Sequence, residues 1–140
     1  MSRWLTYRVT KIMLDQKRFN EFKNLLKEWA KVNNVNLVTH FESENSIEVS
    51  IDNTLVAISL VQDSLRIAIP DYHSKTVKIG GKTYSIIEKI EELAVAADYI
   101  VSAEELGYMI EEIDLREEAT VRTTQQQEEL VDTEDLLIQL

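Results

Sequence analysis

The spacing of apolar residues constrains the fold of this chain most strongly, because it changes twice along the sequence. Between Asp15 and Asn33, apolar side chains recur every three or four residues, as on a helix with one buried face. From Asn36 to Ser85 the spacing becomes two, which is typical of strands. After Ile86 it returns to three and four. This order predicts an α+β fold in which an antiparallel meander sheet is preceded by one N-terminal crossover helix and followed by two C-terminal helices.

The N-terminal part predicts a strand followed by the first of these helices. Residues 3–14 are rich in β-branched and aromatic side chains, which favour a strand. Asp15 stands where its carboxylate can cap a helix that extends to about Asn33. The predicted buried face of that helix consists of Phe19, Phe22, Leu25, Leu26, Trp29 and Val32.

Residues 36–85 predict about four to six strands joined by short turns. The polar triplets DNT and QDS separate apolar runs, as in hairpins. In the last hairpin Gly80 and Gly81 can adopt positive φ at little cost. The letters GKT at 81–83 also end a phosphate-binding loop, but that loop requires a glycine where this chain has Thr76. Nucleotide binding at this hairpin is therefore not expected.

The C-terminal part predicts two helices and an arm. The first helix has an apolar stripe of Ile86, Ile87, Ile90, Leu93, Ala94 and Ala97. Ser102 and Glu105 have the spacing of a capping box for a second helix. That second helix would bury Leu106, Met109, Ile110 and Ile113. We assign residues 1–118 to a single domain and residues 119–140 to a C-terminal arm with a short amphipathic end.

Length and composition narrow the class of protein. The 140 residues suit one domain, and 44% of them are hydrophobic, as in globular proteins. The chain has no cysteine, which excludes a disulfide framework and thiolate chemistry. No stretch approaches the roughly 20 apolar residues of a membrane helix. We expect a cytoplasmic protein that has no membrane partner.

Charge is distributed unevenly along the chain. The net charge of −10 combines a basic first third with a C-terminal part, from residue 86 onward, that carries 16 acidic and three basic side chains. An acidic surface repels nucleic-acid phosphates, so a nucleic-acid role would depend on the first third. There Lys23, Lys27 and Lys31 form a row on the predicted outer face of the helix and are candidate phosphate contacts. The alternative is a solvated helix face.

Candidate catalytic chemistry is sparse. The chain has two histidines, His40 and His73, and a metal or acid–base site would need both of them with carboxylates such as Glu42 and Asp71. Spacing of this kind is common by chance. There is no Gly-x-Ser-x-Gly motif for a nucleophilic serine. We therefore expect no catalytic residue, no metal ligand and no cofactor.

The last residues of the arm predict a contact. Six apolar side chains left in water would each forgo about 1.5 to 3 kcal/mol of burial. We predict that they bind the chain's own sheet, a second copy of the chain or a different protein, and the sequence leaves these three open. The predicted partner-binding residues are Leu130, Val131, Leu136, Leu137, Ile138 and Leu140.

Three functions follow from these features. The first is a small intracellular protein-binding module, such as an adaptor, assembly factor or inhibitor, that acts through its acidic C-terminal surface and apolar arm on a protein partner or on itself. The alternative is a nucleic-acid-associated protein that uses the basic face of the first helix. The third is a small-molecule enzyme built around His40 and His73.

Overall fold

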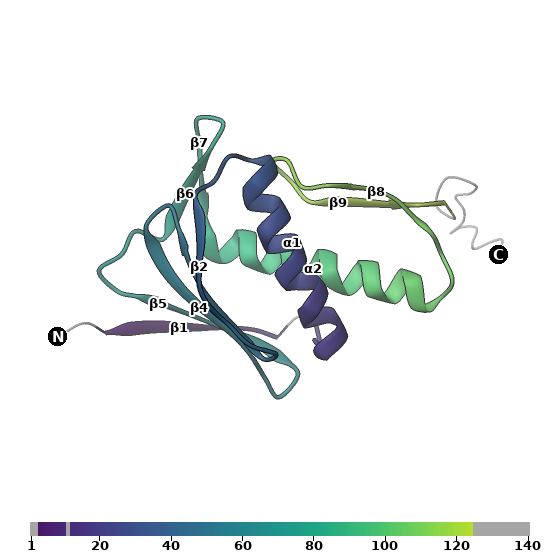
Figure 1. The fold of residues 1–140 in the computed structure, drawn as a ribbon, viewed down its shortest axis with the longest axis horizontal. Helices are drawn as coiled ribbons and strands as arrows, with labels where there is room; N and C mark the ends of the chain where they lie inside the picture. Colours follow the sequence, from purple (N-terminus) through teal and green to yellow (C-terminus); the bar gives the residue numbers. More distant parts are fainter. Residues whose placement is uncertain (1–2, 11, 125–140) are drawn as a thin grey trace.

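Five antiparallel strands form the main sheet in the computed structural model, which describes residues 3–10 and 12–124 (Figure 1). Their order across the sheet is β1-β5-β4-β3-β2. Strands β2 to β5 therefore form a meander, and β1 is the edge strand beside β5. The predicted α+β class and antiparallel meander are confirmed. The strands are β1 (Trp4–Val9), β2 (Leu37–Glu42), β3 (Ser46–Ile51), β4 (Thr54–Val61) and β5 (Ser64–Pro70).

Helix α1 (Gln16–Val32) crosses one face of this sheet and follows the prediction closely. The Asp15 side chain accepts a hydrogen bond of 2.9 Å from the backbone N–H of Arg18, which satisfies one of the free donors at the helix start. Five of the six predicted apolar residues are buried, and Val32 is exposed. The helix thus covers the sheet with a continuous apolar face.

The inner face of the sheet supplies the other half of the core. Ile58 on β4 lies opposite Ile47 on β3 and Ile67 on β5, and all three are buried. Tyr7 continues this row on β1, where it lies opposite Ile67. Because side chains alternate along a strand, the residues between these point to the other side.

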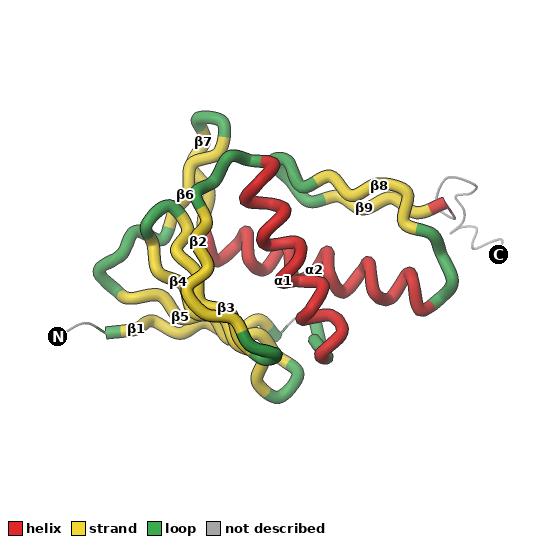
Figure 2. The backbone as a smooth tube through the Cα atoms, viewed as in Figure 1, coloured by secondary structure: helices red, strands yellow, loops and turns green. Residues whose placement is uncertain are grey.

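That other side, which we call the outer sheet face, is open. Both helices lie on the opposite side of the sheet (Figure 2). In β2 the register shifts between Thr39 and Phe41, so that Phe41 lies opposite Glu48 on the outer side. Apart from Pro70, no residue of this face is buried. The face consists of Trp4, Thr6, Arg8, Val38, Phe41, Ser46, Glu48, Ser50, Leu55, Ala57, Ser59, Val61, Ser64, Arg66, Ala68 and Pro70.

A short hairpin leads from the sheet to the second helix. Strands β6 (Thr76–Ile79) and β7 (Lys82–Ser85) pair as predicted, and Gly80 and Gly81 adopt φ values of 57° and 84°. Helix α2 (Ile86–Glu105) follows directly, with the Ser85 hydroxyl accepting a hydrogen bond from the Glu88 N–H. Its apolar stripe joins the common core, and the helix crosses α1 (Figure 1).

The prediction of a second C-terminal helix is wrong. Helix α2 continues through Glu105, so Ser102 and Glu105 lie in its last turn rather than at a new start. The helix ends because Gly107 adopts φ +87°, and the N–H groups of Gly107 and Tyr108 then bond back to Glu104 and Ala103. This pattern is a Schellman ending, for which glycine is the preferred residue. The expected core residues Leu106, Met109 and Ile113 are instead exposed, and Ile110 is partly buried.

A second hairpin follows this ending. It consists of β8 (Ile110–Asp114) and β9 (Thr120–Thr123), and it packs beside α2. Strand β9 uses residues that the sequence analysis assigned to the start of the arm. Residues 125–140, which include all six predicted partner-binding side chains, lie outside the described residues. No helix in the described part of the chain is long and apolar enough to cross a membrane.

Candidate functional site

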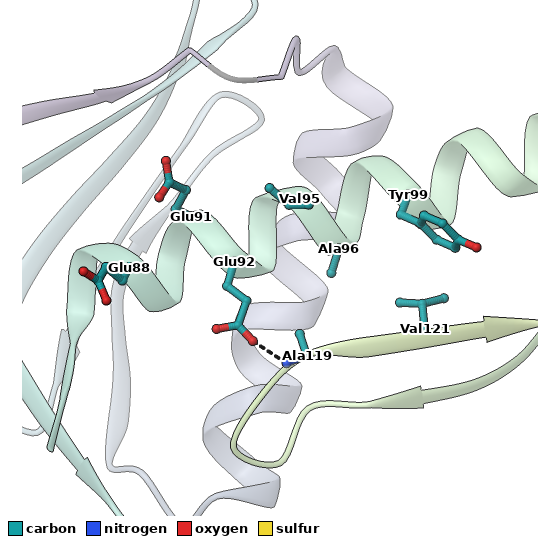
Figure 3. Close-up of a pocket in the computed structure, with 8 residues that line it drawn as sticks. All are labelled: Glu88, Glu91, Glu92, Val95, Ala96, Tyr99, Ala119 and Val121. Atoms are coloured by element: carbon teal, nitrogen blue, oxygen red, sulfur yellow. Dashed lines mark hydrogen bonds between the residues drawn. The ribbon is translucent and has the colours of Figure 1, made fainter. Parts of the chain in front are cut away.

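A groove of about 440 Å³ lies between α2 and β9 (Figure 3). Val95, Ala96 and Tyr99 share one face of α2 because they are three or four residues apart, and they form one wall. Ala119 and Val121 form the other wall from the β9 side. Val95 is 42% exposed although it is apolar. We call this feature the α2/β9 groove, and its surface is mainly apolar.

Three carboxylates line the groove toward the start of α2. Glu88 lies three residues before Glu91 and four before Glu92, so the three side chains are neighbours on the helix surface. Glu92 accepts hydrogen bonds from the Ala119 N–H and, at 3.1 Å, from the Lys89 ammonium. It therefore fixes the start of β9 against α2. Glu88 is exposed, and its backbone N–H rather than its carboxylate makes the helix cap.

An adjoining hollow of about 380 Å³ extends this acidic region. It shares Glu88 and Glu92 with the groove and adds Glu117 and Glu118 from the β8–β9 turn. Lys89 is the one basic residue that lines either hollow, and it is buried.

The Lys89 ammonium is already engaged. It lies 4.4 Å from the centroid of the Tyr84 ring and donates to the Glu117 carbonyl as well as to Glu92. The surface that remains open around the two hollows is therefore acidic.

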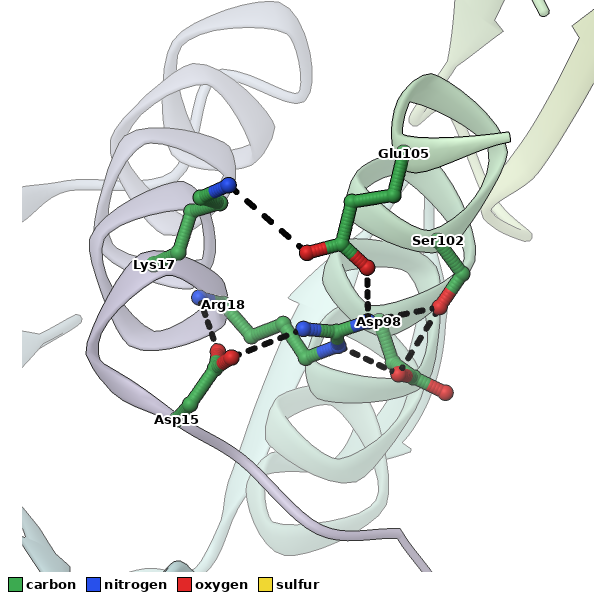
Figure 4. Close-up of polar contacts among 6 residues, drawn as sticks. All are labelled: Asp15, Lys17, Arg18, Asp98, Ser102 and Glu105. Atoms are coloured by element: carbon green, nitrogen blue, oxygen red, sulfur yellow. Dashed lines mark hydrogen bonds and ion pairs between the residues drawn. The ribbon is translucent and has the colours of Figure 1, made fainter. Parts of the chain in front are cut away.

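A polar cluster around Arg18 joins the two helices (Figure 4). Its guanidinium donates to Asp98 at 2.7 Å, to Ser102 at 2.9 Å, to Glu105 at 3.0 Å and to Asp15 at 2.9 Å. The hydrogen bond to Asp98, followed by those to Glu105 and Asp15, raises the pKa of Arg18. Since Arg18 donates to side chains of both helices, this cluster holds α2 against α1.

The predicted lysine row does not form a continuous basic face. The prediction that Lys23 lies on the outer face is wrong, because Lys23 is 7% exposed and donates to the Ser43 carbonyl at 2.8 Å. Lys27 donates to Glu42 at 2.7 Å, and this bond lowers the pKa of Glu42. Lys31 is exposed. Phosphate binding by this row stays a prediction, with two of its three ammonium groups engaged within the protein.

The two histidines make separate contacts. His40 Nε2 lies 2.7 Å from the Ser50 hydroxyl, and His73 Nδ1 accepts a hydrogen bond of 2.9 Å from the Leu55 N–H. Glu42, one of the carboxylates predicted to accompany them, binds Lys27 instead. Among the residues that the structure describes, no group of three or more His, Asp or Glu side chains is arranged to hold a metal ion.

Comparison with known proteins finds no family model, curated protein or solved structure that matches this chain. The α2/β9 groove is thus the best candidate on its geometry alone. Sequence reasoning missed it because its two walls are separated by about 20 residues and meet only through tertiary packing. The available signal was the strand propensity of ATVRTT at 119–124, which places Val121 on a face with Ala119.

Proposed function

We propose that this protein binds a partner protein through the α2/β9 groove and that the bound segment is amphipathic, with Lys or Arg side chains beside apolar ones. The observation that supports this most strongly is the combination of an apolar groove with an adjoining acidic surface. Apolar side chains of the partner gain burial against Val95, Tyr99 and Val121. Its cations face the carboxylates of the rim.

The size of the groove sets the size of the bound element. Sites that enclose small ligands or side-chain clusters have volumes of about 300 to 1,000 Å³. At about 440 Å³ the α2/β9 groove accepts a few side chains from one segment rather than a whole domain. Helices bind grooves of this kind with residues spaced three and four apart.

The charge balance favours one class of partner. Around the groove and the adjoining hollow, Glu88, Glu91, Glu117 and Glu118 add negative charge, and Lys89 is buried in contacts of its own. Nucleic acids and acidic peptides are repelled by such a surface, whereas basic segments are attracted over roughly a Debye length. Adaptors, assembly factors and inhibitors all act by binding of this type.

A peptide titration tests the proposal. The probe is a synthetic helical peptide of leucine and lysine, with the leucines three and four residues apart, and its binding to the full chain is followed by fluorescence anisotropy. The variant Glu88→Lys/Glu91→Lys should weaken binding at least about tenfold, because it reverses two of the rim charges. Glu104→Lys, which changes an exposed acid on the same helix outside the groove, serves as the control and should have little effect. Equal losses in both variants would contradict a specific groove.

Site-specific crosslinking tests the same proposal in the source cells. A photoreactive amino acid at Val95 should capture a protein whose crosslinked segment carries Lys or Arg beside apolar residues. The same group at Glu44, an exposed position in the β2–β3 turn, is the control. If both positions capture the same proteins, or if the Val95 crosslinks map to acidic segments, the proposed function is wrong.

A further inference from the structure

Two arginines of the outer sheet face stand apart from the other arginines of the chain. Arg8 on β1 lies directly opposite Arg66 on β5, and both are exposed. Like charges in this position destabilise a sheet. Neither guanidinium has a carboxylate partner among the described residues. Every other arginine is ion-paired: Arg3 with Asp71, Arg18 with Asp15, Asp98 and Glu105, Arg116 with Asp114, and Arg122 with Glu111 and Glu112.

The surface beside these arginines is flat and weakly polar. Thr6, Ala68 and Ala57 follow one another across β1, β5 and β4 in the next row of the sheet. Two aromatic side chains flank it, Trp4 at 41% and Phe41 at 55% exposure. Small side chains in the middle of a sheet allow another backbone to approach closely. The outer sheet face is therefore a shallow, mainly apolar platform with two unpaired cations on β1 and β5 and one carboxylate, Glu48, on β3. Its net charge is positive, although the chain as a whole carries a net charge of −10.

One part of this chain has the complementary chemistry. The segment of residues 125–140, which we call the C-terminal segment, contains no Lys or Arg, five acidic side chains and six Leu, Val or Ile side chains. Its acids match the two arginines, and its apolar residues match the platform. The same acids are repelled by the α2/β9 groove and its rim. The five acids are Glu128, Glu129, Asp132, Glu134 and Asp135.

The position of β9 favours binding between two molecules. The β8–β9 hairpin runs to the end of the molecule opposite the main sheet along the longest axis (Figure 1). The Thr124 N–H bonds to the Met109 carbonyl at 3.1 Å, so the last described residue is held at that end. Thr124, to which the segment is joined, therefore lies far from the outer sheet face of its own chain.

From these observations we propose that the C-terminal segment of one copy binds the outer sheet face of a second copy, with its carboxylates on Arg8 and Arg66. Two copies that exchange their segments form a closed dimer with two-fold symmetry. This contact is separate from the α2/β9 groove, so the dimer presents two grooves to its partner. It also gives the apolar residues of the arm a defined surface.

Mass measurement on the full chain tests the proposal. Sedimentation equilibrium of the wild type should show a mass that rises with concentration from 16.2 kDa to twice that value. Arg8→Glu/Arg66→Glu and, separately, Asp132→Lys/Asp135→Lys should weaken association at least about tenfold. The matched control Lys78→Glu/Lys82→Glu reverses two exposed charges on the β6–β7 hairpin and should associate like the wild type.

A mixing experiment separates this contact from other causes of association. Each double variant keeps one half of the contact, and the new Lys side chains of one variant match the new Glu side chains of the other, so an equimolar mixture of the two should form dimers. A labelled peptide of residues 125–140 should bind the Asp132→Lys/Asp135→Lys chain but not the Arg8→Glu/Arg66→Glu chain, and added salt should weaken that binding. Circular dichroism of both variants shows whether they are folded.

Three results overturn the proposal. The wild type could stay at 16.2 kDa up to millimolar concentration, or both double variants could associate like the wild type. Alternatively, Arg8→Glu/Arg66→Glu could lose binding to a single-stranded oligonucleotide while its mass is unchanged from that of the wild type. That last result assigns the two arginines to nucleic acid. None of these results bears on the α2/β9 groove, whose peptide titration is independent.

Discussion

The two open surfaces of this protein, the α2/β9 groove and the outer sheet face, differ in shape and in charge. The groove is a hollow between α2 and β9, which lie side by side, and carboxylates line its end toward the start of α2. The outer sheet face is shallow, because Ala57, Ala68 and Ser59 occupy its middle. Its charged side chains are the two arginines on β1 and β5 and Glu48 on β3. Both surfaces rest on the same core. We propose that one chain thus offers two sites that attract segments of opposite charge.

The two sides of strand β5 differ in how much they contribute to the stability of the fold. On β5 the inner residues Leu65, Ile67 and Ile69 are fully buried, while the outer residues Arg66 and Ala68 are not. Neighbouring residues of the same strand therefore differ in role, because one set forms the core and the other forms the open face. Substitutions on the inner side are expected to change mainly the free energy of unfolding, and those on the outer side are expected to change mainly binding.

The largest expected effect is a loss of stability of the core that supports both surfaces. Ile67→Ala should lower the free energy of unfolding by about 2 to 5 kcal/mol, because it leaves a cavity between α1 and the middle of the sheet. Urea unfolding followed by circular dichroism measures it. The matched change on the outer side, Ala68→Ser, should cost less than about 0.5 kcal/mol. Similar losses for the two would mean that the outer sheet face is covered.

Arg18→Ala should affect one surface more than the other. The substitution leaves the Asp98 and Glu105 carboxylates without their shared cation at the α1–α2 junction, and we expect a loss of about 2 kcal/mol. Since α2 carries the groove, amide exchange should accelerate in α2 more than in β4 and β5. Uniform acceleration would show that the two regions do not open separately. Arg66→Ala, which removes an unpaired arginine, is the control.

Asp15→Ala tests the start of α1 and its dependence on pH. The backbone N–H of Arg18 and, with it, the guanidinium of the same residue hold the pKa of Asp15 below its ordinary value of 3.8. A lowered pKa contributes stability that is present above the ordinary value and is lost as the pH falls through the lowered one. The variant should be about 1 kcal/mol less stable at pH 7, and the difference should shrink below about pH 4. A difference that stays constant down to pH 2 would contradict this cause.

Glu21→Gln should have a small effect of opposite sign. Burial, with repulsion from Glu104, raises the pKa of Glu21 above its ordinary value of 4.5. Its ionised form is therefore disfavoured in the folded protein, and this penalty appears as the pH rises through the raised pKa. Glutamine removes the charge, so the variant should be more stable than the wild type by about 0.5 kcal/mol at pH 7 and equal to it below pH 4. Thermal unfolding at the two pH values measures the difference.

Local pattern was sufficient to predict the first two thirds of the fold. The Asp15 cap, the apolar face of α1 and the alternation along β3 to β5 are all set by neighbours in the sequence, and all are present. The prediction failed after Ser102 because two local signals compete there. A capping box favoured a new helix, whereas Gly107 ended the existing one, and the glycine decided the outcome.

The surfaces were harder to predict than the elements. Lys23 has helical spacing with Lys27, but it is buried because the carbonyl of Ser43, twenty residues away, receives its ammonium. The pairing of Arg8 with Arg66 likewise depends on β1 joining the sheet beside β5. Contacts between distant segments fix such features, and the period of apolar residues carries no information on them.

The most direct test asks whether a basic and an acidic peptide bind different surfaces of the same chain, as the opposite charges of the two surfaces require. Amide chemical shifts of the Asp132→Lys/Asp135→Lys protein are recorded with the leucine and lysine peptide and, separately, with the peptide of residues 125–140. We expect the basic peptide to shift the amides of residues 88–99 and 119–121, and the acidic peptide to shift those of β1, β4 and β5. If both peptides shift the same residues, or if the basic peptide binds the sheet, the two surfaces do not have opposite charge preferences.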